Sequence, residues 1–430
     1  MPVQTRQIGL SLGADICWPA CYEELVQRLQ LSLPAPLPGG ADNVEFAVER
    51  VRPEPFDLRG KPKYDLVIDR VTHWFFTTRE WVKKIAIMDD VYVLNNPWMI
   101  QAAEKHTTYC AMMRLGFPIP ETWLLPPKEY PDEADFPVTT RRYNKLFELN
   151  KVGAQVGYPM FMKPYDGGAW RGVSKIDDSA ALHKGYDASG KQIMHLQNAV
   201  DPFDLFVRGV GIGPQVNVIK YDPAAPLHGR YVVDFDFVND KELATLQRFT
   251  RVINAFFCWD YNSCESLRKG GVFHPIDFAN ACPDSQVTSL HYHFPWMVKA
   301  MVKWSLFCAY TKRKPKLNPN WAPYFAIADK DISFDEKLLQ YDALANEYFD
   351  TDRFEEFCAT HLAHIDEVTY DFFGTPRAKE IFREKVSALY PKHEIDAFTD
   401  HFYGLVQFWR KTEADRAPAL KSERAAGRSA

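Results

Sequence analysis

The sequence predicts a mixed α/β (α+β) chain that begins with a small parallel-sheet domain and ends in a helical region. Three observations support this class. Short, β-rich apolar runs alternate with amphipathic helices over residues 1–126, glycine-containing hairpins occur between 158 and 278, and apolar residues fall at helical spacing from 286 onward. Such alternation of strands and helices at the start of a chain is typical of a parallel sheet covered by helices.

The composition is that of an ordinary soluble globular protein. A chain of 430 residues with 46% hydrophobic and 25% charged residues is expected to fold into about two to four subdomains. Its formal net charge of -5 gives no electrostatic attraction toward nucleic acid or an anionic membrane. The N-terminus lacks a signal-peptide pattern, and no apolar run is long enough to span a membrane. Scattered cysteines fit reduced thiols, so we expect a cytoplasmic protein.

The first 126 residues carry the alternating pattern. Strands are predicted at 8–12, 64–70 and 91–94, with a helix opened by Pro19 after the first strand. Ligands gather at the carboxyl ends of strands in such sheets. Asp15, Arg70 and His73 follow strands and are therefore candidates for a substrate pocket, with helix capping and loop hydrogen bonding as the alternative.

A helix is predicted after the third of these strands. Asn96 and Pro97 mark its start and Gly116 its end. Lys105 lies in the middle of this helix, where a lone lysine is usually solvated, so its role depends on its surroundings. The polar, proline-rich stretch 127–145 that follows predicts a linker or an insertion.

A glycine-rich hairpin is predicted at 158–177. A strand ending at Lys163 leads into a loop with Gly167 and Gly168, and Gly172 begins the returning strand. Glycines allow backbone amides to approach a polyphosphate closely, and Lys163 would add a positive charge. No helix opens with Gly-Lys-Ser/Thr, so this is not a Walker A loop. A simple hairpin is the alternative interpretation.

A second hairpin carries acidic residues. Lys269-Gly-Gly271 predicts a tight turn between strands at 258–267 and 272–278. Glu265 and Asp277 would then face one another across the pair, with Asn280 at the strand exit. Carboxylate and amide oxygens are ligands that suit Mg²⁺ shared with substrate phosphates. Solvated acids on a polar hairpin are the alternative.

The remaining elements are mostly helices. An amphipathic helix is predicted at 240–257, before the acidic hairpin. Further helices are predicted at 294–310, 335–349, 353–370, 376–390 and 393–410. Beyond Lys411 the chain is rich in Ala, Ser and charged residues, and this composition predicts a disordered tail.

These pieces, in this order, resemble the ATP-grasp superfamily and its glutathione synthetase-type ATP-binding fold. The resemblance spans about 60–285. It is carried by Leu94-Asn-Asn-Pro97, Leu115-Gly-Phe-Pro-Ile-Pro-Glu-Thr122, Pro159-Met-Phe-Met-Lys-Pro164 and the interval from Glu265 to Asp277. One departure is the final motif, Asp277-Phe-Ala-Asn280, which is one residue longer than acid-x-Asn and would need a bulge.

The resemblance implies a domain organisation. It comprises an N-terminal α/β pre-ATP-grasp domain, an ATP-grasp lid subdomain, a central subdomain with the metal hairpin, a helical C-terminal region and the disordered tail. The predicted bounds are 1–126, 127–200, 201–285, 286–411 and 412–430.

The resemblance also implies roles for individual residues. Lys105 and Lys163 would hold the phosphates of ATP beneath the loop containing Gly167, Gly168 and Gly172. The adenine would be lined by Gln197, Asn198 and Val200, with Asp204 on the ribose. Glu265, Asp277 and Asn280 would bind two Mg²⁺, or Mn²⁺ in their place. Arg208 and Arg171 would stabilise the reacting phosphoryl oxygens, although Arg208 lies four residues after Asp204 where the family commonly has two.

The function implied is an ADP-forming carboxylate–amine ligase. A small-molecule carboxylate would be activated as an acyl phosphate and joined to an amine, giving an amide or peptide bond. Two alternatives remain, an ATP-dependent small-molecule kinase on the same fold and a non-catalytic ATP-binding module. No nucleic acid or membrane partner is expected, and a homodimer is among the possible assemblies.

Overall fold

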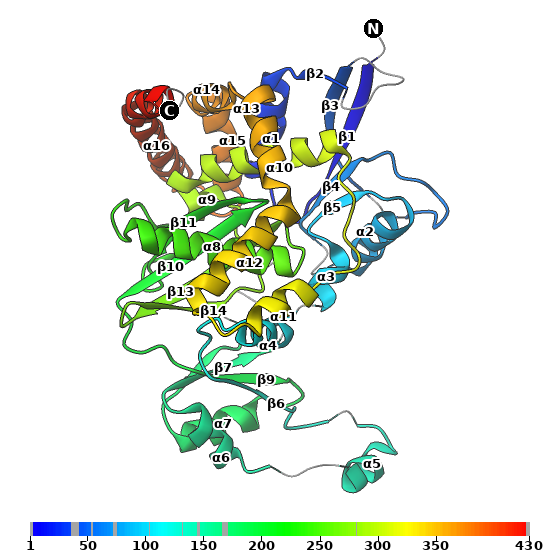
Figure 1. The fold of residues 1–430 in the computed structure, drawn as a ribbon, viewed down its shortest axis with the longest axis vertical. Coiled ribbons are helices and arrows are strands. Elements are labelled where there is room, and N and C mark those ends of the chain that lie inside the picture. The colour runs from blue at the N-terminus through cyan, green and yellow to red at the C-terminus, as the bar shows by residue number, and fades with distance from the viewer. Residues whose placement is uncertain are drawn as a thin grey trace.

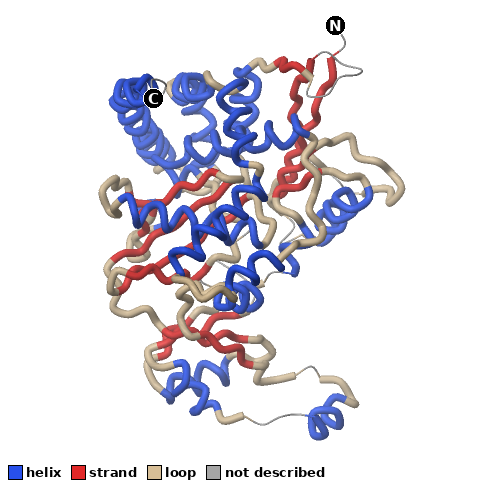
Figure 2. The backbone as a smooth tube through the Cα atoms, viewed as in Figure 1, coloured by secondary structure: helices blue, strands red, loops and turns tan. Residues whose placement is uncertain are grey.

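The computed structural model describes residues 3–35, 43–52, 55–71, 75–102, 104–130, 132–143, 147–165, 171–280 and 282–426. His73, Gly167 and Gly168, which we predicted to be functional, lie outside these ranges. Within them the strands form three sheets, and helices cover the sheets and build one end of the molecule (Figure 1, Figure 2). None of the described helices combines the length and apolar character needed to cross a bilayer.

The N-terminal sheet is mainly parallel, as predicted. Strand β1 pairs in parallel with β3 and β4, and β4 with β5, while β2 runs antiparallel to β3 at the edge. The elements are β1 (Val3–Ser11), α1 (Cys17–Leu29), β2 (Ser32–Pro34), β3 (Asn43–Arg50), β4 (Leu66–Asp69), α2 (Phe76–Met88) and β5 (Tyr92–Leu94). Periodicity did not predict β2 and β3, because β3 is only half-buried along most of its length and carries charged residues.

The helix expected from Pro97 to Leu115 is instead two helices. They are α3 (Pro97–Ala102) and α4 (Lys105–Arg114). Glu104 between them has extended backbone, with φ -73° and ψ 169°. Lys105 is therefore the first residue of α4 rather than a mid-helix residue. The sequence carries no strong capping residue at this break, so spacing alone did not reveal it.

The segment that we predicted as the lid subdomain, called the lid below, is a small antiparallel sheet with its own core. Its strand order is β6-β9-β7-β8, and the elements are β6 (Thr122–Leu125), α5 (Phe136–Tyr143), α6 (Leu149–Val156), β7 (Met160–Pro164), β8 (Ser174–Ile176), α7 (Ser179–Ala188) and β9 (Met194–Asn198). Strand β6 pairs with β9, so the lid sheet begins before residue 127, the boundary we predicted. The large core of the molecule joins the N-terminal sheet, the central sheet and the C-terminal helices, which together we call the main body. A separate core contains Leu125, Met162, Leu182 and Leu196.

The central sheet is antiparallel and packs against one long helix. Its strand order is β12-β11-β10-β13-β14. The strands are β10 (Leu205–Ile212), β11 (Gln215–Tyr221), β12 (Tyr231–Val232), β13 (Tyr261–Lys269) and β14 (Val272–Asp277). The 3₁₀ helix η1 (Leu227–Gly229) precedes β12, and α8 (Asp240–Phe256) precedes β13. Gly209 on β10 allows α8 to approach closely, since a Cβ there would lie 2.2 Å from Oγ1 of Thr250.

The C-terminal region is helical, as predicted, but two details differ. Its elements are α9 (Val287–Leu290), η2 (His291–His293), α10 (Phe294–Thr311), α11 (Ala322–Ala328), α12 (Phe334–Phe349), α13 (Thr351–His361), α14 (Ile365–Phe373), α15 (Pro376–Ser387) and α16 (Ile395–Ala426). The single helix expected at 353–370 is divided into α13 and α14. Helix α16 continues into the segment 412–430 where we expected disorder, because Ala, Glu, Lys and Arg are also strong helix formers.

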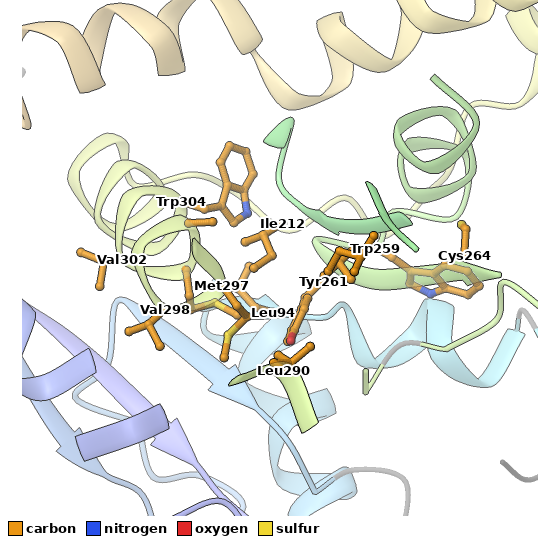
Figure 3. Packing of buried hydrophobic residues seen from close by; sticks show 14 of the residues in the cluster. Leu94, Ile212, Trp259, Tyr261, Cys264, Leu290, Met297, Val298, Val302 and Trp304 are labelled. Carbon is orange, nitrogen blue, oxygen red and sulfur yellow. The ribbon is translucent and has the colours of Figure 1, made fainter. Parts of the chain in front are cut away.

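Helix α10 joins the N-terminal and central sheets. Its Met297, Val298 and Trp304 pack in one core with Leu94 of β5 and Ile212 of β10 (Figure 3). This helix is apolar on nearly all sides, which is the pattern of a helix buried within a large core.

A buried carboxylate lies at the same junction. Asp260, 1% exposed, accepts hydrogen bonds from the hydroxyl of Tyr92 at 2.7 Å and from Nε1 of Trp304 at 2.9 Å. The backbone amide of Asp260 donates to Oδ1 of Asn95 at 2.7 Å. Burial raises the pKa of Asp260 to about 6, although Arg313 opposes this shift. Asp260, directly before β13, thus connects β5 with α10 through buried hydrogen bonds. We call this group of contacts the Asp260 hub.

This hub predicts a pH-dependent contribution to stability. A folded-state pKa of about 6 lies above the ordinary value of 3.8, so the wild type gains stability from a protonated Asp260 at low pH and loses it as pH rises through about 6. Relative to the Asp260→Asn variant, the loss should reach on the order of 3 kcal/mol. Unfolding of both proteins between pH 4 and 8 measures the difference, and a pH-independent difference would contradict it.

Candidate functional site

The acidic hairpin forms as the sequence predicts. Gly270 and Gly271 both have positive φ, 58° and 79°, and join β13 to β14. Glu265 pairs directly with Asp277 across the two strands. A bulge lies beside this pair, because Ser266 is opposite Pro275 and Ile276 is the extra residue. The bulge precedes Asp277 rather than falling between Asp277 and Asn280, where we expected the adjustment.

The extra residue of the bulge provides a shared acceptor. The carbonyl oxygen of Ile276 accepts a hydrogen bond from the hydroxyl of Tyr109 at 2.7 Å and another from Nζ of Lys163 at 3.2 Å. Helix α4 and lid strand β7 therefore both attach to β14 at this carbonyl. A bulge that frees a backbone carbonyl from the ladder explains why two different elements meet there.

Each carboxylate of the hairpin pairs with a cation from another element. Nζ of Lys105, at the start of α4, lies 3.1 Å from Oδ2 of Asp277. Nη2 of Arg208, on β10, hydrogen-bonds Oε1 of Glu265. Nζ of Lys163 also donates to Oε1 of Gln197 at 2.7 Å. Charged residues from the lid, the central sheet and α4 thus converge on the hairpin.

Burial and charge act in opposite directions on these groups. Burial raises the pKa of Glu265 above its usual value, even though Arg208 opposes the shift. At Asp277 burial has the same effect, but the ammonium groups of Lys105 and Lys163 outweigh it and hold the pKa below its usual range. Burial lowers the pKa of Lys163 to about 8, against the attraction of Asp277. The Glu265 side chain is 12% exposed and that of Asp277 is 32% exposed, so Asp277 is the acid that a ligand reaches more easily.

Asn280 lies close to the hairpin in a fixed orientation. Its Nδ2 donates to Oγ of Ser263 at 2.9 Å, and its backbone amide donates to Oδ1 of Asn262 at 2.9 Å. The amide nitrogen is therefore engaged, and the amide oxygen is the atom that can serve as a ligand. Within the described segments no three His, Cys, Asp or Glu side chains gather in a way that could hold a metal. The candidate set here is two carboxylates and an amide oxygen, a hard-oxygen set that fits Mg²⁺ in chemistry.

The predicted nucleotide residues do not all meet at the hairpin. Gln197 contacts Lys163, as described above, whereas Nδ2 of Asn198 turns to the carbonyls of Val156 and Gly157 at 2.9 and 3.2 Å. Val200 is buried in the core of the main body. Asp204 forms an ion pair with Arg268, 3.1 Å away, on the surface.

The described end of the glycine loop is open to solvent. Arg171 is exposed. Gly172 has a φ of +72°, and a Cβ there would lie 2.8 Å from Cγ of Pro164. Both the positive φ and the close approach require glycine at this position.

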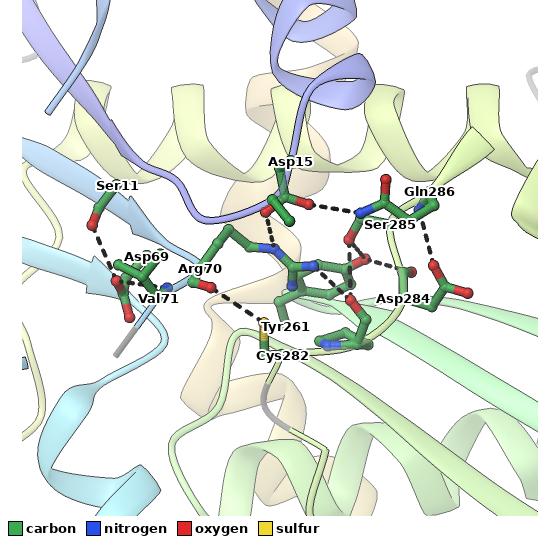
Figure 4. A network of polar contacts seen from close by, with 12 residues as sticks. Ser11, Asp15, Asp69, Arg70, Val71, Tyr261, Cys282, Asp284, Ser285 and Gln286 are labelled. Carbon is green, nitrogen blue, oxygen red and sulfur yellow. Dashed lines mark hydrogen bonds and ion pairs between the residues drawn. The ribbon is translucent and has the colours of Figure 1, made fainter. Parts of the chain in front are cut away.

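Asp15 and Arg70 come together in a second polar cluster (Figure 4). Nε of Arg70 donates to Oδ2 of Asp15 at 3.2 Å, and its Nη2 donates to the carbonyl of Pro283 at 2.8 Å. Nε2 of Gln286 donates to Oδ1 of Asp15 at 3.0 Å. Within the described structure, Nη1 of Arg70 and Oε1 of Gln286 have no hydrogen-bond partner although both are buried.

This cluster lines a pocket of about 200 Å³. The lining residues are Ala14, Asp15, Arg70, Cys282, Pro283, Asp284, Ser285 and Gln286. The pocket combines the ends of β1 and β4 with residues 282–286, so it lies between the N-terminal sheet and the segment that follows the acidic hairpin. Two unsatisfied buried polar atoms in a pocket wall are a feature that a bound ligand can explain.

Several residues near the hairpin were not predicted from the sequence. The hydroxyl of Tyr109 donates a hydrogen bond to the carbonyl of the bulge residue Ile276. The hydroxyl of Tyr231 accepts a hydrogen bond of 2.5 Å from Nη1 of Arg208. His195 is fully buried and stacks on His106, with ring centroids 5.6 Å apart. Its burial, together with nearby His106, lowers its pKa to about 3. Strand alternation could have placed His195 on the same face as Gln197, but nothing in the sequence singles out the two tyrosines.

The pairing of buried charges predicts unequal stability effects. Arg208→Met would leave Glu265 buried without its cation and should lower the free energy of unfolding by about 3–5 kcal/mol, partly recovered by adding Glu265→Gln. Asp204→Asn removes an exposed ion pair and should cost less than about 1 kcal/mol. Denaturant unfolding without nucleotide or metal measures both. Equal losses in the two single variants would show that the Arg208–Glu265 pair is solvated.

No protein-family model matches the chain, and the comparison with curated proteins found no match. Solved structures do match. A RimK-domain ATP-grasp protein from Sphaerobacter thermophilus is 14% identical with a TM-score of 0.45, covering 70% of this chain and 99% of that one. D-alanine–D-alanine ligase from Bacillus anthracis, complexed with ATP, is 10% identical with a TM-score of 0.47, covering 72% and 99%. The macrocyclase MdnC of Microcystis aeruginosa, bound with a precursor peptide, is 10% identical with a TM-score of 0.45, covering 70% and 98%.

Identities this low, at TM-scores below 0.5, carry no argument about this chain, so its fold and function are argued from its own residues. The elements themselves follow the order that the sequence predicts. A parallel α/β unit precedes an antiparallel lid sheet, and the lid precedes a central antiparallel sheet that ends in the acidic hairpin.

Proposed function

We propose that this protein is an ATP- and Mg²⁺-dependent ligase that joins a small-molecule carboxylate to an amine and releases ADP and phosphate. The observation that carries the proposal is the convergence at the hairpin. Glu265 and Asp277 lie side by side and pair with Arg208 and Lys105, and Lys163 of a third element binds the neighbouring carbonyl of Ile276. Acids arranged next to cations in this way can bind metal ions and phosphate groups respectively, and a purely structural ion pair would not need so many charges.

In this proposal the cations and the acids separate when the nucleotide binds. Lys105 and Lys163 would hold phosphate oxygens, while Glu265, Asp277 and the amide oxygen of Asn280 would hold two Mg²⁺, or Mn²⁺. The bound metal would neutralise charge on the phosphates and polarise the transferred phosphoryl group. Gly172 and Arg171, with the segment 166–170 that contains Gly167 and Gly168, would close over the phosphates.

The nucleoside end would lie between the lid sheet and the central sheet. Gln197, next to Lys163 in the structure, is the best-placed of the predicted adenine residues, with Asn198 and Val200 following it on the same segment. Asp204 would bind the ribose only after releasing Arg268, to which it is paired at 3.1 Å. The exposed position of this pair means that its exchange for a ribose hydroxyl would require little free energy.

The pocket lined by Asp15 and Arg70 is our candidate for the substrate. The free N–H of Arg70 Nη1 would donate to a carboxylate or carbonyl, and Oε1 of Gln286 would accept from an amine or hydroxyl. His73, three residues beyond Arg70 in sequence, is a further candidate from the sequence. A pocket that begins at the ends of β1 and β4 and reaches the segment after Asn280 would present the substrate to the phosphoryl group.

The proposed reaction needs no nucleophilic side chain. Transfer of the γ-phosphoryl group of ATP to a substrate carboxylate gives an acyl phosphate and ADP. An amine then attacks the acyl carbon, the C–O bond to phosphate breaks, and the amine loses a proton as the amide forms. Arg208 would stabilise the charge on the phosphoryl oxygens, so catalysis depends on positioning and electrostatic stabilisation.

The metal assignment predicts how ATP binding depends on Mg²⁺. Without metal, Glu265 and Asp277 would repel the triphosphate, so the affinity for ATP in EDTA should fall by at least about tenfold, or ~1.4 kcal/mol. Calorimetric titration of ATP with and without Mg²⁺ measures this change. Equal affinities would rule out the hairpin as a metal site.

The proposal also predicts the effect of removing one acidic charge. Asp277→Asn should lower ADP release by at least about 10²-fold, comparable with the loss of one strong transition-state contact. Asp329→Asn, which removes a surface partner of Arg114, is the matched control and should leave activity unchanged. The assay measures Mg²⁺-dependent ADP release against pooled amino acids and carboxylates, with and without amines.

The same assay separates the alternatives. ADP release that is independent of any amine would favour a kinase acting on a hydroxyl. ATP binding without turnover in any pool would favour a non-catalytic nucleotide-binding module. An Asp277→Asn variant as active as the wild type would remove this acid from the site.

A further inference from the structure

Arg208 is held by aromatic residues as well as by its carboxylate. Its guanidinium carbon lies 4.5 Å from the ring centroid of Tyr221 and 5.3 Å from that of Tyr231. Nη1 donates to the hydroxyl of Tyr231 at 2.5 Å, and Nη2 donates to Glu265. The side chain is only 10% exposed. The plane of the guanidinium is thus defined by two hydrogen bonds to opposite partners, one neutral and one anionic.

The two groups that hold Arg208, Glu265 and the hydroxyl of Tyr231, differ in their effect on its charge. Glu265 neutralises the charge of Arg208, and in the proposed function it must also serve the metal. The hydroxyl of Tyr231 accepts one N–H without supplying a charge, so the guanidinium keeps its full positive charge while it is held. Burial raises the pKa of Tyr231 well above its usual value, which keeps the hydroxyl neutral.

Tyr231 belongs to a strand that is too short to be stable alone. Strand β12 has two residues and lies at the edge of the central sheet, where Tyr231 is opposite Tyr221. A two-residue edge strand needs further support. The 3₁₀ helix η2 provides it, because Nε2 of His293 lies 3.3 Å from the carbonyl oxygen of Val232.

The support extends to the C-terminal helix. Helix α16 packs against η2, and the ring of Phe408 on α16 lies 5.5 Å from that of Tyr292 between the two histidines. A continuous set of contacts therefore runs from α16 through η2 and β12 to Tyr231, and from there to Arg208 and Glu265.

We propose that Tyr231 is a positioning residue for Arg208, and that the C-terminal helical region supports the site by holding β12 in place. Tyr231 keeps the guanidinium in its orientation when Glu265 turns from Arg208 to the metal. This inference rests on the proposed role of Arg208 in phosphoryl transfer, but the placement of Arg208 by Tyr231 can be tested without any reaction.

The kinetic test uses Tyr231→Phe, which keeps the ring and removes the hydroxyl. ADP release at saturating ATP should fall by about tenfold or more, because a misplaced catalytic group is costly, while the KM for ATP changes by less than about twofold. Tyr22→Phe is the control, since the hydroxyl of Tyr22 also forms a buried hydrogen bond, 2.7 Å to Ser305 in the core. It should lose comparable stability and no activity.

A double-mutant cycle distinguishes positioning from a general structural effect. If Tyr231 acts through Arg208, then Tyr231→Phe should have little further effect in the Arg208→Lys background. An equal loss in both backgrounds, or a loss of stability with unchanged turnover, would overturn the proposal.

A spectroscopic measurement is independent of activity. In ¹⁵N-labelled protein without nucleotide, restricted rotation about the Nε–Cζ bond should keep the Nη1 and Nη2 resonances of Arg208 apart. Tyr231→Phe leaves only Glu265 to hold the guanidinium and should speed the exchange between the two resonances. Merged resonances in the wild type, or exchange that is no faster in the variant, would overturn the inference. Separate resonances that exchange faster in the variant would uphold the placement of Arg208, and a wild type that then releases no ADP would overturn only the proposed function.

Discussion

Two carboxylates that lie side by side and are only partly exposed to water are unfavourable unless positive charge surrounds them, and this constraint organises the site. Glu265 and Asp277 face one another because β13 and β14 pair with a bulge beside them. Arg208 on β10 and Lys105 on α4 supply the compensating charge. The sheet, the helix and the hairpin are consequently held in one arrangement by a balance of charges that a metal-bound polyphosphate could take over.

The lid depends on this arrangement for its contact with the main body. It has a hydrophobic core of its own, and polar contacts join it to the hairpin. Lys163 reaches the carbonyl of Ile276, the same atom that Tyr109 of α4 binds. A subdomain with a separate core and polar contacts at its edge can change its position without unfolding. This construction would permit the closure on a nucleotide that we propose, whereas the Asp260 hub is fully buried within the main body.

The pocket and the helical region extend the site in two directions. On one side Arg70 and Asp15 join the ends of β1 and β4 to the segment after Asn280, which places the candidate substrate pocket between the N-terminal and central sheets. On the other side the contacts from α16 through η2 end at Tyr231 and Arg208. The C-terminal helices are thus more than a covering layer, because the short strand that they support carries Tyr231, which hydrogen-bonds Arg208 beside the hairpin.

The sequence by itself determined the order of the larger parts, the mainly parallel N-terminal sheet and the pairing of Glu265 with Asp277, since these follow from local hydrophobic spacing and from two glycines that favour a tight turn. It also singled out Asp15 and Arg70, which the structure brings together. It did not reveal the break before Lys105, the place of β6 in the lid sheet or the contact of Tyr231 with Arg208. Those features depend on partners far away in the chain. Only the tertiary structure could decide them, because long-range contacts leave no periodic trace in the residues that make them.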